Sequence, residues 1–261
     1  MPDIPDRLTR EDELTRDLTK IFVRQRRVVR SAKGQNVPWT TFQAGVEQAF
    51  VVHLSATFEI ARRLFLEERA ATEEELALFL FLIGQGDLPF GTTPRPAGQR
   101  TTTGQEFAQG VAGPLAARVT SKSQEGVSRA KQHGEEAGRA ADGVDGGPSA
   151  TVTSNRVFND AIKPTFSTDR AESISITETT GAISAGEDSG ARIVEQQDDV
   201  ILSKTWVTEA DARVCPICRP LHLKPESFWP QFPNGPPAHP RCRCWLVWVD
   251  NNGRRVGRIT N

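Results

Sequence analysis

The chain has 261 residues, a formal net charge of −1 at pH 7 and a mean hydropathy of −0.43. This length accommodates two modest domains, and the near-neutral charge argues against a protein that binds nucleic acid over its whole surface. The sequence begins with acidic residues and no apolar signal segment, and no apolar run is long enough to span a bilayer, so we expect no membrane association.

Residues 1–90 are predicted to form a helical region. Apolar residues recur on one stripe over residues 8–30 and again over residues 40–69, where His53 is interpreted as a packed helix histidine. A capping box at Thr72 predicts a third helix, which is apolar on all sides and ends near Ile83. Arginines at the end of the first helix could contact DNA or an acidic partner, but a solvated helix face is the favoured interpretation: Arg24, Arg26, Arg27 and Arg30.

Residues 91–153 are predicted to be a flexible middle region because they are rich in Gly, Pro and Thr. Within it, weak apolar periodicity favours one helix over residues 114–132. The glycines between residues 134 and 150 are interpreted as a linker.

Residues 154–261 are predicted to form a small α+β module. A short helix is expected around residues 158–166 and a long one over residues 169–197, with a strand near Ile174 as the competing interpretation. Two apolar segments, residues 200–207 and 245–249, are typical of strands, and the Asn-Asn-Gly sequence after the second predicts a hairpin.

All four cysteines and two of the four histidines lie between Trp206 and Trp245. Cys215 and Cys218 are separated by two residues, as are His239 and Cys242, and Cys244 follows. Two such turns facing each other provide the tetrahedral thiolate and imidazole ligands that zinc prefers. The sequence therefore predicts a structural zinc ion held by four of these five residues. The favoured set leaves Cys244 in reserve, as a replacement for Cys242 or His239.

Three other interpretations of the cysteines are less well supported. Disulfides do not suit a chain without a secretory signal. A redox pair at Cys215 and Cys218 would leave the second cluster without a role. A zinc deaminase requires a proline directly before its Cys-x-x-Cys, and Val214 stands at that position.

The same stretch resembles a known family. Its ordered residues are Trp206, Thr208, Asp211, Arg213, Cys215, Cys218 and Leu221, followed by Pro236, His239, Cys242, Arg243 and Cys244. This pattern is similar to the signature of the phage head morphogenesis (Mu F-like) minor head proteins, and the segment from Arg170 to Thr179 is similar to the helix that precedes it. The resemblance covers roughly residues 105–250 and is strongest over the last forty.

The resemblance implies a structural, non-enzymatic minor head protein of a phage or prophage. It implies association with the portal protein and with capsid or scaffold proteins during head assembly and DNA packaging or ejection. The expected location is the virion, and the host cytoplasm during assembly. The fold class expected is a mainly α N-terminal region with a small, zinc-stapled α+β C-terminal module.

Two other classes of function stay open. The cluster from Cys215 to Cys244 would serve a zinc-dependent enzyme if three protein ligands and a water held the metal. The C-terminal end carries more basic than acidic residues, which suits a module that makes non-specific DNA contacts.

Overall fold

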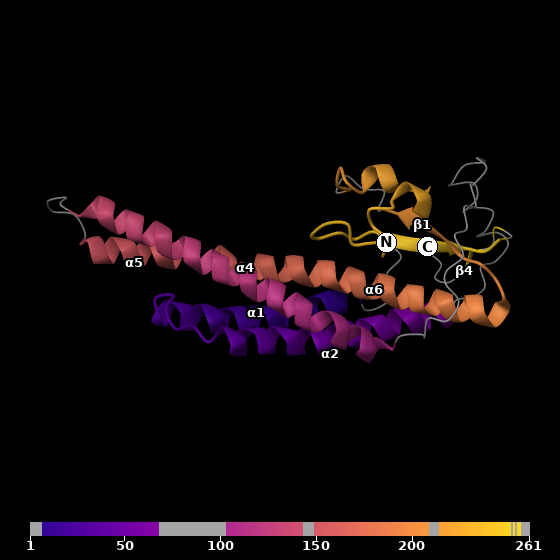
Figure 1. Ribbon diagram of the computed structural model, residues 1–261, viewed down its shortest axis with the longest axis horizontal. Helices are drawn as coiled ribbons and strands as arrows, with labels where there is room; N and C mark the ends of the chain where they lie inside the picture. Colours follow the sequence, from indigo (N-terminus) through magenta and orange to yellow (C-terminus); the bar gives the residue numbers. More distant parts are fainter. Residues whose placement is uncertain are drawn as a thin grey trace. The chain divides into compact units, whose positions relative to one another are not determined.

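The computed structural model describes residues 7–67, 103–142, 149–208, 214–251, 253 and 255–256 (Figure 1). The described chain is mainly helical and ends in a small antiparallel sheet, which confirms the predicted mainly α region and small α+β module, while its zinc stays a prediction. The α-helices and strands, in chain order, are α1 (Arg7–Ser31), α2 (Trp39–Glu67), α4 (Gly104–Ala141), α5 (Ala150–Ala161), α6 (Thr168–Asp198), β1 (Ser203–Val207), β2 (Lys224–Pro225), β3 (Trp245–Val249) and β4 (Arg255–Val256). Three short 3-10 helices, η1 (Pro164–Phe166), η2 (Arg219–Leu221) and η3 (Glu226–Phe228), connect them.

The residues divide into two compact units. The first consists of residues 1–11, 54–107 and 176–261, and the second of residues 12–53 and 108–175. Four of the helices, α1, α2, α4 and α6, therefore contribute residues to both. The prediction that the chain divides at residues 90 and 153 stays a prediction.

The second unit is built on the predicted apolar stripes of α1 and α2. Leu14, Leu18 and Phe22 of α1 are fully buried. The Phe22 ring packs against Phe42 of α2 at 6.0 Å and edge-on against Phe166 at 6.1 Å between centroids. The stripe spacing of three and four residues thus identified the buried faces correctly. The capping box at Thr72 and the apolar run to Ile83 lie outside the described residues.

His53 is buried, as the prediction of a packed helix histidine requires, and it also has a polar partner. Its Nε2 lies 3.0 Å from Oδ2 of Asp17 on α1. Hydrogen bonds from Lys20 and from His53 lower the pKa of the Asp17 carboxyl. The carboxylate therefore stays charged and joins α1 to α2 at the edge of the core.

The middle of the chain is more helical than predicted. The predicted helix over residues 114–132 is the central part of α4, which begins at Gly104 and continues to Ala141. A capping box starts it: Glu106 N–H donates to Thr103 Oγ1 at 3.2 Å, and Thr103 N–H donates to the Glu106 carboxylate at 2.9 Å. The predicted helix over residues 114–132 is therefore confirmed, and the flexibility predicted from composition is wrong for residues 104–113 and 133–141.

Two glycines of the predicted linker lie where α4 meets α5. Figure 1 shows these two helices side by side. A Cβ atom added to Gly134 would lie 2.9 Å from the Ser154 carbonyl oxygen, and one added to Gly138 would lie 3.1 Å from that of Ala150. These glycines allow two helices to approach closely, which is the opposite of a flexible role.

The long helix predicted over residues 169–197 is α6, so the competing strand at Ile174 is wrong. Ser167 caps its start, because its Oγ accepts the N–H of Arg170 at 3.2 Å. Small side chains on α6 allow α2 to pack closely against it. A Cβ added to Gly186 would collide with the Phe58 carbonyl, and one added to Gly190 would collide with the Phe65 ring. The small-residue face of α6 is therefore a packing face.

Both predicted strands are present, and they pair with each other in a sheet of order β2-β1-β3-β4. Antiparallel register sets Thr205 opposite Val247 and Trp206 opposite Leu246. The predicted hairpin is confirmed where Val256 pairs with Trp248. On the α6 side, buried Lys204 donates to the Asp188 carboxylate at 2.9 Å, which ties β1 to the helix. None of the helices described is long and apolar enough to cross a membrane.

Candidate metal centre

The first pair of donors lies on a tight turn after β1. The Cys218 N–H points at Cys215 Sγ, 3.3 Å away, and Arg219 N–H donates to the Cys215 carbonyl at 3.0 Å. The next residues form η2, whose Leu221 is buried. Pro216 lacks an N–H and fixes its own φ, which suits this turn. The turn directs both thiols to the same side.

The second pair lies on a similar turn before β3. Cys242 N–H donates to the His239 carbonyl at 3.1 Å, so the ring and the thiol emerge close together. His239 Nδ1 lies 2.7 Å from the Pro240 carbonyl, which can only accept a hydrogen bond. This contact assigns the proton to Nδ1 and leaves Nε2 as a lone-pair donor. Fixing one ring nitrogen on a backbone carbonyl is typical of histidines that bind metals.

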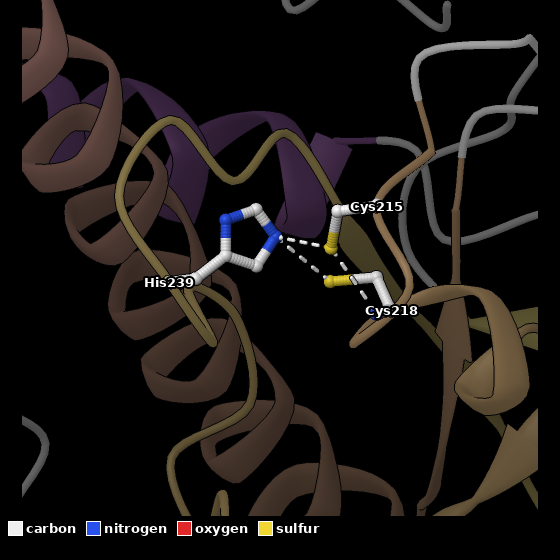
Figure 2. Close-up of side chains that lie close together, drawn as sticks. All are labelled: Cys215, Cys218 and His239. Atoms are coloured by element: carbon white, nitrogen blue, oxygen red, sulfur yellow. Dashed lines mark hydrogen bonds between the residues drawn. The ribbon is translucent and has the colours of Figure 1, made fainter.

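The two turns face each other (Figure 2). His239 Nε2 lies 2.8 Å from Cys215 Sγ and 3.2 Å from Cys218 Sγ, and the ring points between the two sulfurs. A second group combines Cys218, Cys242 and Cys244, and in each group the donor atoms all lie within 4.8 Å of one another. The structure thus brings together all five residues predicted from the spacing, and Cys218 belongs to both groups.

These distances suit a tetrahedral metal site. Zinc–sulfur bonds of about 2.3 Å place two sulfur ligands roughly 3.8 Å apart, and Cys218 Sγ lies 3.9 Å from Cys242 Sγ. The contacts of His239 are shorter than the roughly 3.5 Å that a shared zinc would impose on nitrogen and sulfur, because hydrogen bonds join these atoms here. All four cysteines are free thiols, so the disulfide interpretation finds no support among them.

The thiols of the second group influence one another strongly. The hydrogen bond with Cys218 lowers the pKa of Cys242, and the same hydrogen bond raises the pKa of Cys218. The hydrogen bond with Cys218 lowers the pKa of Cys244. The hydrogen bond with Cys242 and the burial of the thiol have the opposite effect, and together they raise the pKa of Cys244 to about 12. Burial and mutual repulsion disfavour three thiolates together in this group, and a divalent cation would offset that repulsion.

The proline-rich segment between the two turns is anchored by aromatic packing. The centroid of the fully buried Trp229 ring lies 5.4 Å from that of Trp206. The centroid of the Phe232 ring lies 5.7 Å from that of Trp206, in the same core. Trp229 Nε1 donates to the Lys224 carbonyl at 3.0 Å. Gly235 has a φ of 74°, and a Cβ there would meet Leu246 at 2.8 Å. This core includes Cys218, Cys242 and Cys244, so three of the five candidate donors are buried in it.

Two residues that hold the second turn carry no sequence signal of that role. Thr180 of α6 donates to the Cys242 carbonyl at 2.7 Å, and Thr177 Oγ1 accepts the Arg241 N–H at 2.9 Å. Thr177 belongs to the segment that resembles the family's preceding helix, but nothing there indicates its partner. His222, in the same stretch, belongs to neither group of candidate metal ligands. Its Nδ1 accepts a hydrogen bond from the Thr208 N–H at 3.1 Å. Asp211 and Arg213 of the motif lie outside the described residues.

The C-terminal half of the chain matches a known protein family. Residues 137–247 match the family model described as phage Mu protein F like protein. The match confirms the resemblance indicated by the Cys/His motif over these residues, and it supports a phage head protein. No curated protein and no solved structure matches the chain.

Proposed function

We propose that this chain is a structural minor head protein of a phage or prophage whose C-terminal module is stapled by one zinc ion. The observation that carries the proposal is that all five converging donors lie within residues 137–247, the range that matches the Mu F-like family. The proposed role is association with the portal and with capsid or scaffold proteins during head assembly and DNA packaging or ejection. The proposed location is the virion.

The proposed ligands are Cys215, Cys218, His239 and Cys242, with Cys244 able to replace Cys242 or His239. Both pairs of the favoured set lie on turns of the same length, and their donor atoms face one another. Thiolate and imidazole donors in a tetrahedral arrangement favour zinc over the oxygen-seeking magnesium and calcium ions.

A structural metal is favoured over a catalytic one. A catalytic zinc ion needs a coordination position open to water and substrate. Here Cys218, Cys242 and Cys244 are all buried in the aromatic core, and the chain offers more protein donors than a closed tetrahedral shell requires. The supported role of the metal is therefore to hold two loops together in a module with a small core.

Two measurements test the proposal. Purified full-length protein is expected to contain one zinc ion per chain by elemental mass spectrometry after gel filtration. Co-expressed with the portal protein of the same phage genome, it is expected to co-purify with the portal, while the portal of an unrelated phage serves as the control. Protein without metal contradicts the zinc proposal. A stable monomer that does not bind the portal, capsid or scaffold proteins contradicts the minor head proposal.

A further inference from the structure

A buried polar chain connects the start of α1 to the second metal-binding turn. Arg7 Nη2 donates to Thr180 Oγ1 at 2.8 Å, and Thr180 in turn donates its hydroxyl proton to the Cys242 carbonyl at 2.7 Å. Arg7 and Cys242 are 5% and 1% exposed, and Thr180 is 1% exposed. The hydroxyl has one proton to give and lone pairs to receive, so both bonds form together only in this direction.

A second connection runs in parallel with the first. Arg7 Nε donates to the Glu11 carboxylate at 2.9 Å, and the other oxygen of Glu11 lies 3.8 Å from Arg243 Nη2. Glu11 is buried, and Arg243 stands between Cys242 and Cys244. The buried charges of Arg7 and Glu11 need their partners, because an unpaired buried charge is strongly destabilising. The first helical turns of α1 are thus paired with the metal-binding turn by hydrogen bonds and charge.

The backbone of this turn requires external support. Arg241 has a φ of 61°, in the left-handed region of backbone conformation that residues other than glycine rarely adopt. Its N–H donates to Thr177, one helical turn before Thr180 on α6. Two threonines on one face of α6 therefore hold the backbone on either side of the Cys242 amide.

We infer that Thr180 is a positioning residue of the metal site and that it couples metal binding to the seating of the first turns of α1. The inference rests on the proposed zinc site. Fixing the Cys242 carbonyl fixes the direction in which its thiol points, as partners beyond the ligands commonly do in metal sites. If the turn opens when the metal leaves, Thr180 loses its acceptor and Arg7 loses the oriented hydroxyl. The two equilibria are linked. If metal binding favours the seated position of Arg7 by some factor, the seated position of Arg7 increases the metal affinity by the same factor.

The first experiment compares the zinc affinities of full-length variants by competition with a chromophoric chelator. Thr180→Val keeps the shape of the side chain but removes both hydrogen bonds, and it is expected to weaken zinc binding about tenfold or more. Thr180→Ser keeps the hydroxyl and is expected to stay within about threefold of the wild type. Thr41→Val makes the same chemical change at an exposed position of α2 and is expected to change nothing.

The second experiment reads the coupling at α1 without any substitution. Hydrogen exchange is measured on metal-free and zinc-loaded wild type at the amides of residues 11–15, whose helical acceptors are the carbonyls of residues 7–11. Zinc is expected to slow this exchange about fivefold or more, the lower end of typical coupling between two sites. In Thr180→Val loaded with saturating zinc, most of the slowing should disappear.

The outcomes separate the two proposals. A wild type that binds no zinc overturns the proposed metal site itself. A wild type that binds zinc, with an affinity that Thr180→Val leaves unchanged, overturns the positioning role. Zinc-independent exchange at residues 11–15 of the wild type overturns the coupling, even if Thr180→Val fails to fold.

Discussion

The five candidate donors do not contribute equally, because Cys218 alone belongs to both donor groups. Cys218→Ser should therefore abolish zinc retention, and Cys215→Ser should do the same because it opens a four-ligand shell. Cys242→Ser is expected to reduce retention more than Cys244→Ser, since Cys244 is the reserve donor. Zinc per chain after gel filtration measures each effect.

The two histidines of the same stretch provide a matched pair for this series. His239→Asn is expected to lower the zinc content, because His239 Nε2 faces the sulfurs of Cys215 and Cys218. His222→Asn is expected to retain full zinc, because His222 Nδ1 is occupied by Thr208. Equal loss in both variants would indicate a general effect on folding and would count against His239 as a ligand.

The convergence of the candidate donors could be predicted from sequence because the spacing within each pair is local. Turns of two intervening residues determine how each pair of side chains points, whatever the rest of the fold does. The groups that support them could not be predicted in this way. Thr180 acts on a residue 62 positions later, and Arg7 acts on Thr180 across 173 positions. Nothing in the local sequence of either residue distinguishes these bonds from an ordinary solvated helix face.

At the scale of elements, helices with apolar stripes were predictable, and the two ends of α4 beyond residues 114–132 were not. The stripes of α1 and α2 repeat every three or four residues, and burial follows them. Composition misled over α4, because glycine favours flexibility in an isolated chain but close approach beside a neighbouring helix. Only the position of α5 decides which property applies. The capping box at Thr103 was the local signal that a helix begins within this Gly- and Thr-rich region.

Two glycines of α4 make this distinction measurable. Gly134→Ala should destabilise the protein by about 1–3 kcal/mol, because the new methyl group overlaps the Ser154 carbonyl and Phe158. Gly110→Ala should stabilise it by roughly 0.5–1 kcal/mol, since nothing lies within 4 Å of the added carbon and alanine favours a helix. Urea denaturation followed by far-ultraviolet circular dichroism gives both values. If the two substitutions have equal effects, the close packing of α4 on α5 is wrong.

At the scale of the whole molecule, two kinds of interaction hold the C-terminal module. The aromatic packing of Trp206, Trp229 and Phe232 anchors the proline-rich segment, and the proposed zinc ion joins the turns at its two ends. Hydrogen bonds between thiols and imidazole are weak compared with metal–thiolate bonds. The metal is therefore expected to supply stability that this small core lacks.

Removal of the metal should consequently unfold one part of the chain and spare the rest. A chelator is expected to release one zinc ion and to loosen the module from about residue 200 onward, because binding energy at a site absent from the unfolded chain is folding energy. The three fully buried tryptophans, Trp206, Trp229 and Trp248, should then give a red-shifted fluorescence.

Most of the helical circular dichroism should survive chelation, since α1, α2, α4 and α5 contain none of the donors. Added zinc should restore the fluorescence, and magnesium, which prefers oxygen ligands, should not. Unchanged fluorescence after complete metal release would mean that aromatic packing alone holds the module. Loss of most helical signal would mean that the helices depend on the metal as well.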